Sequence, residues 1–181
     1  IFDILTESNG LISLIAKGIK KKKDGSLLQP FKELQLSYTN KGSLPMLTKF
    51  EIINSFSEIK NKYLLIGLYF NELIYKFIPK SEPLPSLYSI YKKQLEYMKK
   101  TKDTPDVVLL TFETMFLKEI GYEVTEGFGG NGVVAILKNG KGKTIMLRAD
   151  MDGLPVKERT GVSYASKKKV INLEGQEVFT M

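Results

Sequence analysis

Two carboxylates stand one residue apart, directly behind a basic residue. The stretch "KTIMLRADMDGLP" (143–155) reads as an apolar strand followed by Arg148, Asp150 and Asp152. This pattern is typical of the approach to a metal-dependent hydrolytic site, because carboxylates bind hard cations and orient metal ligands. The chain has no His and no Cys, the residues that supply most zinc ligands and the usual general base. Two aspartates alone make a weak cation site, so we predict no metal, no cofactor and no catalytic residue. The alternative role of this stretch is plain loop structure, with Arg148 paired to an aspartate.

A second group of residues could contact phosphate. Four consecutive lysines lie in the turn-rich stretch "KKKKDGS" (20–26). Lysines in the loops of a small barrel bind nucleic-acid backbones with strong salt dependence and little sequence preference. A solvated lysine turn is the alternative. The candidate DNA contacts are Lys17, Lys20, Lys21, Lys22, Lys23, Lys32, Lys41 and Lys49.

The net charge of +7 is unevenly distributed along the 181 residues. Residues 1–105 hold 17 Lys and 10 acidic residues, whereas residues 106–181 hold ten basic and ten acidic residues. All of the excess positive charge therefore lies in the first part. A basic part beside a neutral part indicates two modules, the first with an anionic partner such as a nucleic acid.

The elements that must position these lysines are short strands. Apolar or alternating pieces occur at 1–5, 11–19, 27–31, 32–39 and 44–53, separated by polar turns. This predicts a small antiparallel barrel or sandwich. In 32–39, Leu34, Leu36 and Tyr38 share one face. Tyr38 is thus expected in the core, with base stacking as the alternative.

Helical spacing begins further along the chain. Apolar residues recur every three or four positions over 54–78, which predicts a helix whose Phe and Tyr side chains form core, or alternatively a partner groove. A second helix is expected over 86–100. A third is expected over 106–120, capped by Asp103 or Thr104, with Pro105 in its first turn and Gly121 at its end.

Beyond Gly121 the pattern returns to strands. We expect strands over 132–138 and 143–149 around the turn "NGKG", and another hairpin about "LEG" (173–175). The stretch "GFGGNG" (127–132) lacks the Lys-Ser/Thr ending of a phosphate loop and predicts a turn. The longest apolar run, 63–70, is too short to span a membrane, and no signal peptide is evident. A cytoplasmic protein is therefore expected.

Residues 1–122 resemble RecO, a family of bacterial recombination mediators. The matching features are Ala16-Lys17-Gly18, the Lys20–Lys23 run, "LLQPF", the strand to Tyr38, Glu51, Glu72-Leu73 and "TFETMFLKEIGY". The resemblance implies an OB-fold domain over 1–53, whose first strand is missing because Ile1 falls inside the second, and a helical segment over 54–122. It also implies binding and annealing of single-stranded DNA without catalysis, with RecR and single-strand binding protein as partners.

The tail resembles a different family. From Gly121, "GYEVTEGFGGNGVVAILKNGKGKTIMLRADMDGLPVKERTGVSYAS" is similar to the first strands of zinc-dependent amidohydrolases of the aminoacylase type. In that family the metal-binding His-Ala-Cys-Gly-His-Asp motif follows the matched segment, and here the chain ends first. The resemblance implies a truncated α/β fragment over 123–181, inactive for lack of metal ligands. The expected fold class is α+β, a hybrid in which either incomplete part could prove non-functional.

Overall fold

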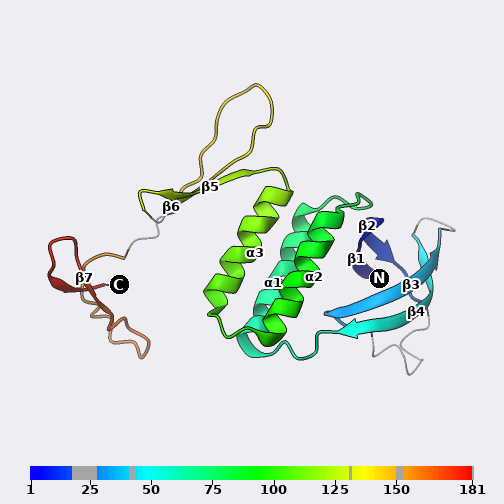
Figure 1. Cartoon of the computed structure of the whole chain (residues 1–181), viewed down its shortest axis with the longest axis horizontal. Coiled ribbons are helices and arrows are strands. Elements are labelled where there is room, and N and C mark those ends of the chain that lie inside the picture. Colours follow the sequence, from blue (N-terminus) through cyan, green and yellow to red (C-terminus); the bar gives the residue numbers. More distant parts are fainter. Residues whose placement is uncertain (18–27, 41–43, 131, 150–152, 181) are drawn as a thin grey trace. The chain divides into compact units, whose positions relative to one another are not determined.

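The structure is a computed structural model that describes residues 1–17, 28–40, 44–130, 132–149 and 153–180 (Figure 1). The chain divides into two compact units. The first comprises Ile1–Glu126 with Val133–Lys138, and the second comprises Gly127–Gly132 with Asn139–Met181. Every buried hydrophobic side chain among the described residues lies between Leu11 and Phe116, so the hydrophobic core belongs to the first unit.

The first unit opens with two antiparallel hairpins. Strand β1 (Phe2–Thr6) pairs with β2 (Gly10–Leu14), and β3 (Lys32–Thr39) pairs with β4 (Met46–Ser55). The alternation predicted for β3 is confirmed over its central part. Leu34 and Leu36 are half-buried, whereas Gln35 and Ser37 are exposed. Two register shifts in the β3–β4 ladder bend this hairpin.

The two hairpins meet at one point, where Ile15, the residue after β2, lies beside Met46 of β4. Ile15 and Met46 form an isolated parallel bridge. The Ile15 N–H donates to the Pro45 carbonyl (2.8 Å), and the Leu47 N–H donates to the Ile15 carbonyl (2.9 Å). The expected antiparallel strands are therefore present, but within the described residues they form two two-stranded sheets and not a closed barrel.

Three helices follow: α1 (Asn61–Phe77), α2 (Pro85–Lys100) and α3 (Pro105–Glu119). The predictions for α2 and α3 as helices are confirmed, with Pro105 in the first turn of α3. Thr104 occupies the N-cap position of α3, but its side chain makes no capping hydrogen bond. The start predicted for α1 at residue 54 is wrong. Residues 54 and 55 still pair with β3, and Ile59 donates its N–H to the Phe56 carbonyl (3.1 Å), so the spacing of these two apolar residues comes from a turn.

Aromatic residues from α1 and α3 form the centre of the core. The Phe70 and Phe112 rings stack with centroids 3.8 Å apart, and Phe112 stacks on Phe116 at 5.8 Å. The prediction that the aromatic residues of 56–77 form core holds for Phe56 and Phe70. It fails for Tyr69, Tyr75 and Phe77, which are exposed. The fully assembled cluster comprises Phe56, Ile59, Ile66, Phe70, Ile74, Ile78, Leu87, Leu95, Met98, Val108, Phe112 and Phe116.

Glycines let the strands come close to the helical part. A Cβ at Gly67 of α1 would lie 2.8 Å from the Phe31 ring, so a larger residue here would force this ring to shift. Gly10, at the start of β2, has φ +67°, and its Cβ would lie 2.0 Å from the Glu82 carbonyl oxygen. The Ser81 N–H donates to the Leu11 carbonyl (3.0 Å). The α1–α2 connection is therefore held against the first hairpin.

The tail contains two small hairpins. Strands β5 (Glu123–Phe128) and β6 (Gly132–Ile136) pair across the glycine-rich stretch, which confirms the predicted turn there. Strands β7 (Lys169–Ile171) and β8 (Glu177–Phe179) flank the predicted turn about 173–175.

The strand predicted at 143–149 is wrong. The described residues of this stretch are in no strand, and Ile145, Met146 and Leu147 are 85%, 80% and 94% exposed. A strand requires a neighbour for its backbone groups, and no described strand pairs with this segment.

Among the described residues, no helix is both long enough and apolar enough to cross a membrane.

Candidate nucleic-acid interface

The described candidate lysines lie on the two hairpins. Lys17 is exposed and follows the bridge residue Ile15, and Lys49 is exposed in β4, opposite Ser37. Neither has an ion pair within the described part of the chain. Their ammonium groups are therefore available to an anion. The remaining candidates, Lys20, Lys21, Lys22, Lys23 and Lys41, lie outside the described residues.

Lys32 differs from these two lysines. It begins β3 and is half-buried, and its Nζ donates a hydrogen bond to Ser55 Oγ at 2.5 Å. Ser55 is its register partner in β4. This contact ties the Lys32 side chain to the hairpin, so a phosphate would have to compete with a bond already formed.

Tyr38 borders two cavities of about 610 Å³ each. The first cavity lies among β1, β3 and α2, and the second lies beside β2 and the Lys80–Pro83 segment. Tyr38 is half-buried and belongs to the same alternating set as Leu34 and Leu36. Neither Tyr38 nor these two leucines belongs to the hydrophobic core cluster of the described residues, so the prediction that Tyr38 is a core residue is not confirmed.

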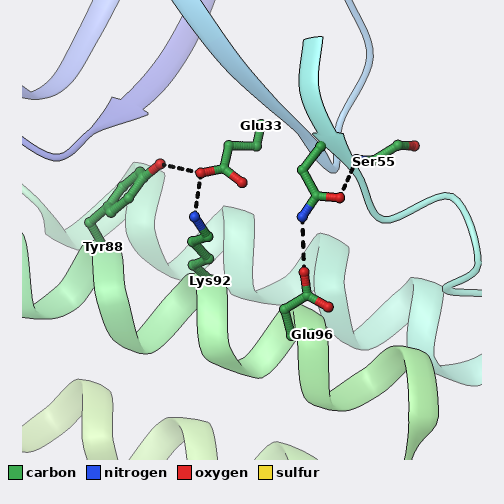
Figure 2. A network of polar contacts seen from close by, with 6 residues as sticks. Glu33, Ser55, Tyr88, Lys92 and Glu96 are labelled. Atoms are coloured by element: carbon green, nitrogen blue, oxygen red, sulfur yellow. Dashed lines mark hydrogen bonds and ion pairs between the residues drawn. The ribbon is translucent and has the colours of Figure 1, made fainter.

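Polar contacts hold β3 against α2, as Figure 2 shows. Glu33 Oε1 accepts hydrogen bonds from Lys92 Nζ (2.5 Å) and from the Tyr88 hydroxyl (3.4 Å). The Glu33 side chain is only 14% exposed. The hydrogen bond to Glu33 raises the pKa of Lys92, and burial, then the nearby Glu33 charge, raises the pKa of Tyr88.

A second set of contacts joins the end of β4 to α2. Asn54 Nδ2 donates to Glu96 Oε1 (2.9 Å), and Asn54 Oδ1 accepts from the Ser55 N–H (2.8 Å) (Figure 2). Lys99 lies 3.5 Å from Glu96 and 3.8 Å from Glu58. The hydrogen bond from Asn54, followed by the Lys99 charge, lowers the pKa of Glu96. Lys92 and Lys99 therefore serve structure, since acidic partners already neutralise them.

A third contact joins the α1–α2 connection to the first hairpin. Lys80 Nζ lies 2.8 Å from Asp3 Oδ1, and Ser13 Oγ donates to the same oxygen at 2.5 Å. The Lys80 hydrogen bond, followed by that of Ser13, lowers the pKa of Asp3. Sequence reasoning did not single out any of these pairs. No local signal could reveal them, because Asp3 and Lys80 are 77 positions apart and Glu33 and Lys92 are 59 apart.

The hydrolase-like motif is only partly visible. Arg148 is exposed in the strandless stretch before Asp150 and Asp152, and both aspartates lie outside the described residues. Nearby, Glu158 accepts hydrogen bonds from Thr160 Oγ1 and the Ser166 N–H, both at 2.5 Å, which lower its pKa. Within the described ranges, no three His, Cys, Asp or Glu side chains come together as a metal site would require.

Comparison with known families matches the first unit in two consecutive pieces. Residues 1–56 match the model "Recombination protein O N terminal", and residues 62–125 match "Recombination protein O C terminal". Neither match extends beyond residue 125.

Individual relatives agree with this match. The chain is 35% identical over 127 residues to the DNA repair protein RecO of Burkholderia pseudomallei, covering 69% of this chain and 46% of the relative. It is 29% identical over 168 residues to RecO of Nitrosococcus oceani, covering 87% and 68%. For RecO of Methylococcus capsulatus the identity is 32% over 124 residues, covering 67% and 51%. The chain thus spans about half the length of two of these three relatives.

The alignment with RecO of Nitrosococcus oceani covers 87% of this chain, so it extends beyond residue 125 into the tail. The resemblance of the tail to amidohydrolases remains a prediction from the sequence. Both domain models of one family match in order, and together they cover more than half of the chain. Residues 1–125 of this chain therefore belong to the RecO family of DNA repair proteins.

Proposed function

We propose that this chain acts in recombinational DNA repair by binding single-stranded DNA and assisting its annealing, without catalysing a reaction. The observation that carries the proposal is the coincidence of the RecO match with the positive charge. Residues 1–125 match the family, and the whole net charge of +7 lies in residues 1–105. Basic surface of this kind attracts phosphates by releasing their counterions.

The described lysines support this proposal to different degrees. Lys17 and Lys49 are exposed and free of ion pairs in the described part, whereas Lys32 is bound to Ser55. We therefore expect Lys17 and Lys49 to contribute more than Lys32. The run Lys20–Lys23 and Lys41 remain proposed contacts on the strength of sequence alone.

Fluorescence anisotropy with labelled single-stranded DNA over a salt series tests the proposal. The variant pair Lys17→Gln/Lys49→Gln is compared with Lys167→Gln/Lys168→Gln, which removes the same charge from the tail. The slope of log K against log salt is negative, and we expect the first pair to make it less steep by about 0.7 for each phosphate that a lysine no longer neutralises. The tail pair should leave the slope unchanged.

Binding that is insensitive to salt, or a folded sample that does not bind, would contradict the proposal. Equal effects of both variant pairs would show that only net charge matters. Failure of the natural chain to unfold cooperatively would instead favour a non-functional hybrid of the two families.

We further propose that residues 123–181 are similar to the first strands of an amidohydrolase and that this chain has no hydrolase activity, because it contains neither His nor Cys to bind zinc. Three consecutive apolar residues, Ile145–Leu147, are almost fully exposed, as expected of a sheet segment without its neighbours. Incubation with N-acyl amino acids and added zinc should yield no turnover. Chelator-sensitive hydrolysis would overturn this assignment.

The proposal also includes two protein partners, RecR and single-strand binding protein, and a location in the bacterial cytoplasm. They follow from the family alone, because no described surface identifies either partner. Co-elution of the purified chain with each purified partner, with and without DNA, would test these interactions separately.

A further inference from the structure

Helix α2 carries an excess of positive charge towards its end. Residues 93–102 contain four lysines and one acidic residue, Glu96. Glu96 is already engaged, because its carboxylate lies 3.5 Å from Lys99 Nζ. Lys93 and Lys100 are exposed and have no ion pair within the described part of the chain. The helix dipole favours lysines only in the last turn of a helix, so it accounts for Lys100 but not for Lys93.

These two lysines share one face of α2 with a tyrosine. Lys93, Tyr97 and Lys100 are spaced by four and then three residues, which places them on the same side of the helix. Figure 2 shows that Lys92 and Glu96 point toward the second hairpin. Lys93 and Tyr97 each follow one of these residues by one position, so they are turned about 100° away from the hairpin contact. The lysine–tyrosine face, consisting of Lys93, Tyr97 and Lys100, is therefore not used by the contacts that hold the strands against α2.

Tyr97 offers a ligand its ring and not its hydroxyl. The residue is 43% exposed, and its hydroxyl donates a hydrogen bond to Asp103 Oδ2. Because the hydroxyl is already bonded, the ring is the part of this side chain that remains for a ligand. The bond also restrains the ring before a ligand arrives, which lowers the entropy lost on binding. Bases stack on such rings with little sequence preference, while lysines on either side can bind the neighbouring phosphates.

We propose that the lysine–tyrosine face of α2 is a second contact for single-stranded DNA. One base stacks on Tyr97, and Lys93 and Lys100, one turn to either side of it, bind phosphates. This inference rests on the proposed function and adds a contact on the helical part to those proposed for Lys17 and Lys49 on the hairpins. An acidic polypeptide could also meet the two lysines, but it carries no base for the ring that lies between them.

Stacking is tested by fluorescence anisotropy of the full chain with labelled oligothymidylate and with an abasic strand of the same length. Tyr97→Leu should weaken binding of oligothymidylate by about tenfold and leave binding of the abasic strand unchanged. Tyr97→Phe keeps the ring and removes the bond to Asp103, so it should bind like the natural chain. Tyr164→Leu removes a tyrosine of the tail that is 86% exposed and should have no effect on either strand.

The phosphate contacts are tested by the salt dependence of the same binding. Lys93→Gln/Lys100→Gln should make the negative slope of log K against log salt less steep by about 0.7 for each phosphate that is no longer neutralised. The change should appear with both strands, because the abasic strand keeps its phosphates. Thermal unfolding of every variant confirms that it is folded.

Other results would overturn this inference. If Lys17→Gln/Lys49→Gln weakens binding but the Tyr97 and Lys93/Lys100 variants do not, the proposed function stands and the second contact is wrong. A folded natural chain that binds neither strand would remove both. Equal losses with oligothymidylate and the abasic strand in Tyr97→Leu would show that no base stacks there. Displacement of the DNA by polyglutamate that depends on Lys93 and Lys100 but not on Tyr97 would reassign this face to an acidic polypeptide.

Discussion

At the scale of single residues, the absence of a side chain at Gly10 permits close contact between the first hairpin and the backbone of Glu82. Its φ of +67° and the nearby Glu82 carbonyl both exclude a Cβ. The first hairpin can lie against the α1–α2 connection only because this position is glycine. The Ser81–Leu11 hydrogen bond and the Lys80–Asp3 pair then complete the contact.

We therefore predict that Gly10→Ala lowers the free energy of unfolding by about 2 kcal/mol or more, since strain and a backbone clash add. Gly121→Ala is the control, because Gly121 also has positive φ (+95°), while the nearest atom is a side-chain carbon at 3.8 Å. Only strain acts there, so about 1 kcal/mol is expected. Urea denaturation measures both values. Equal decreases would mean that the close approach to Glu82 contributes nothing.

The lowered pKa of Asp3 makes a prediction about acid stability. A carboxylate whose pKa is lower in the folded state stabilises the protein above its unfolded pKa, near ~3.9. That contribution is lost as the pH falls through the lowered folded pKa. Asp3→Asn should therefore be less stable than the natural chain at about pH 6, with the difference shrinking below about pH 4.

Urea midpoints measured from about pH 6 into the acid range would follow this convergence. Glu174→Gln, which removes one exposed carboxylate from the tail, serves as the comparison. A difference between Asp3→Asn and the natural chain that stays constant across this range would show that the Lys80 and Ser13 contacts do not depend on the Asp3 charge.

At the scale of elements, the packing of α2 on α3 contains one unsatisfied polar group. Gln94 is 7% exposed, its Nε2 contacts Met115 Sδ at 3.9 Å, and its Oε1 has no hydrogen-bond partner among the described residues. A buried acceptor without a donor forgoes the hydrogen bonds that water provides in the unfolded chain. This interface is accordingly less stable than its apolar surroundings would allow.

Gln94→Leu should raise the free energy of unfolding by about 1 kcal/mol, because it removes an unsatisfied acceptor at similar volume. Gln94→Glu should lower it, because a charge would then be buried beside Met115 at a position that is only 7% exposed. Thermal and urea unfolding report both changes. Stabilisation by Glu, or destabilisation by Leu, would indicate that the Gln94 amide has a partner in solution.

At the scale of the whole molecule, stability is concentrated in the first unit. Its core joins the end of the second hairpin to all three helices, and three sets of polar contacts attach the strands to the helical part. The described residues of the tail include no buried hydrophobic side chain. The tail hairpins therefore depend on a few local contacts, such as Lys169–Glu177 across β7 and β8.

Limited trypsin digestion should therefore cut first at Lys141 and Lys143, which are exposed and outside any strand. A fragment ending near Lys138 should persist. Lys92 and Lys99 are internal controls, since α2 holds both within the packed bundle. Mass spectrometry of early products identifies the sites. Initial cleavage inside 61–119 would contradict this ordering of stability.

The sequence by itself determined those features that depend on neighbouring residues. The alternation of Leu34, Leu36 and Tyr38 specifies one face of β3, and Pro105 after Thr104 specifies the start of α3. The hairpin around 173–175 follows from its turn residues for the same reason. The order of motifs over the first 122 residues also indicated the RecO family, which the two matches support.

Tertiary structure alone decided the features that join distant residues. The ion pairs Glu33–Lys92 and Asp3–Lys80 attach strands to the helical part, so these two lysines stabilise the fold. The cavity lined by β1, β3 and α2 likewise forms only where these three elements meet. Tertiary context also overruled local pattern. Residues 54 and 55 pair with β3, and Phe56 and Ile59 are joined by a turn, although the apolar spacing favours a helix from residue 54. The apolar stretch 143–149 forms no strand. The physical reason is that backbone hydrogen bonds and apolar burial both need a partner surface, and periodicity along one segment does not show whether the rest of the chain supplies it.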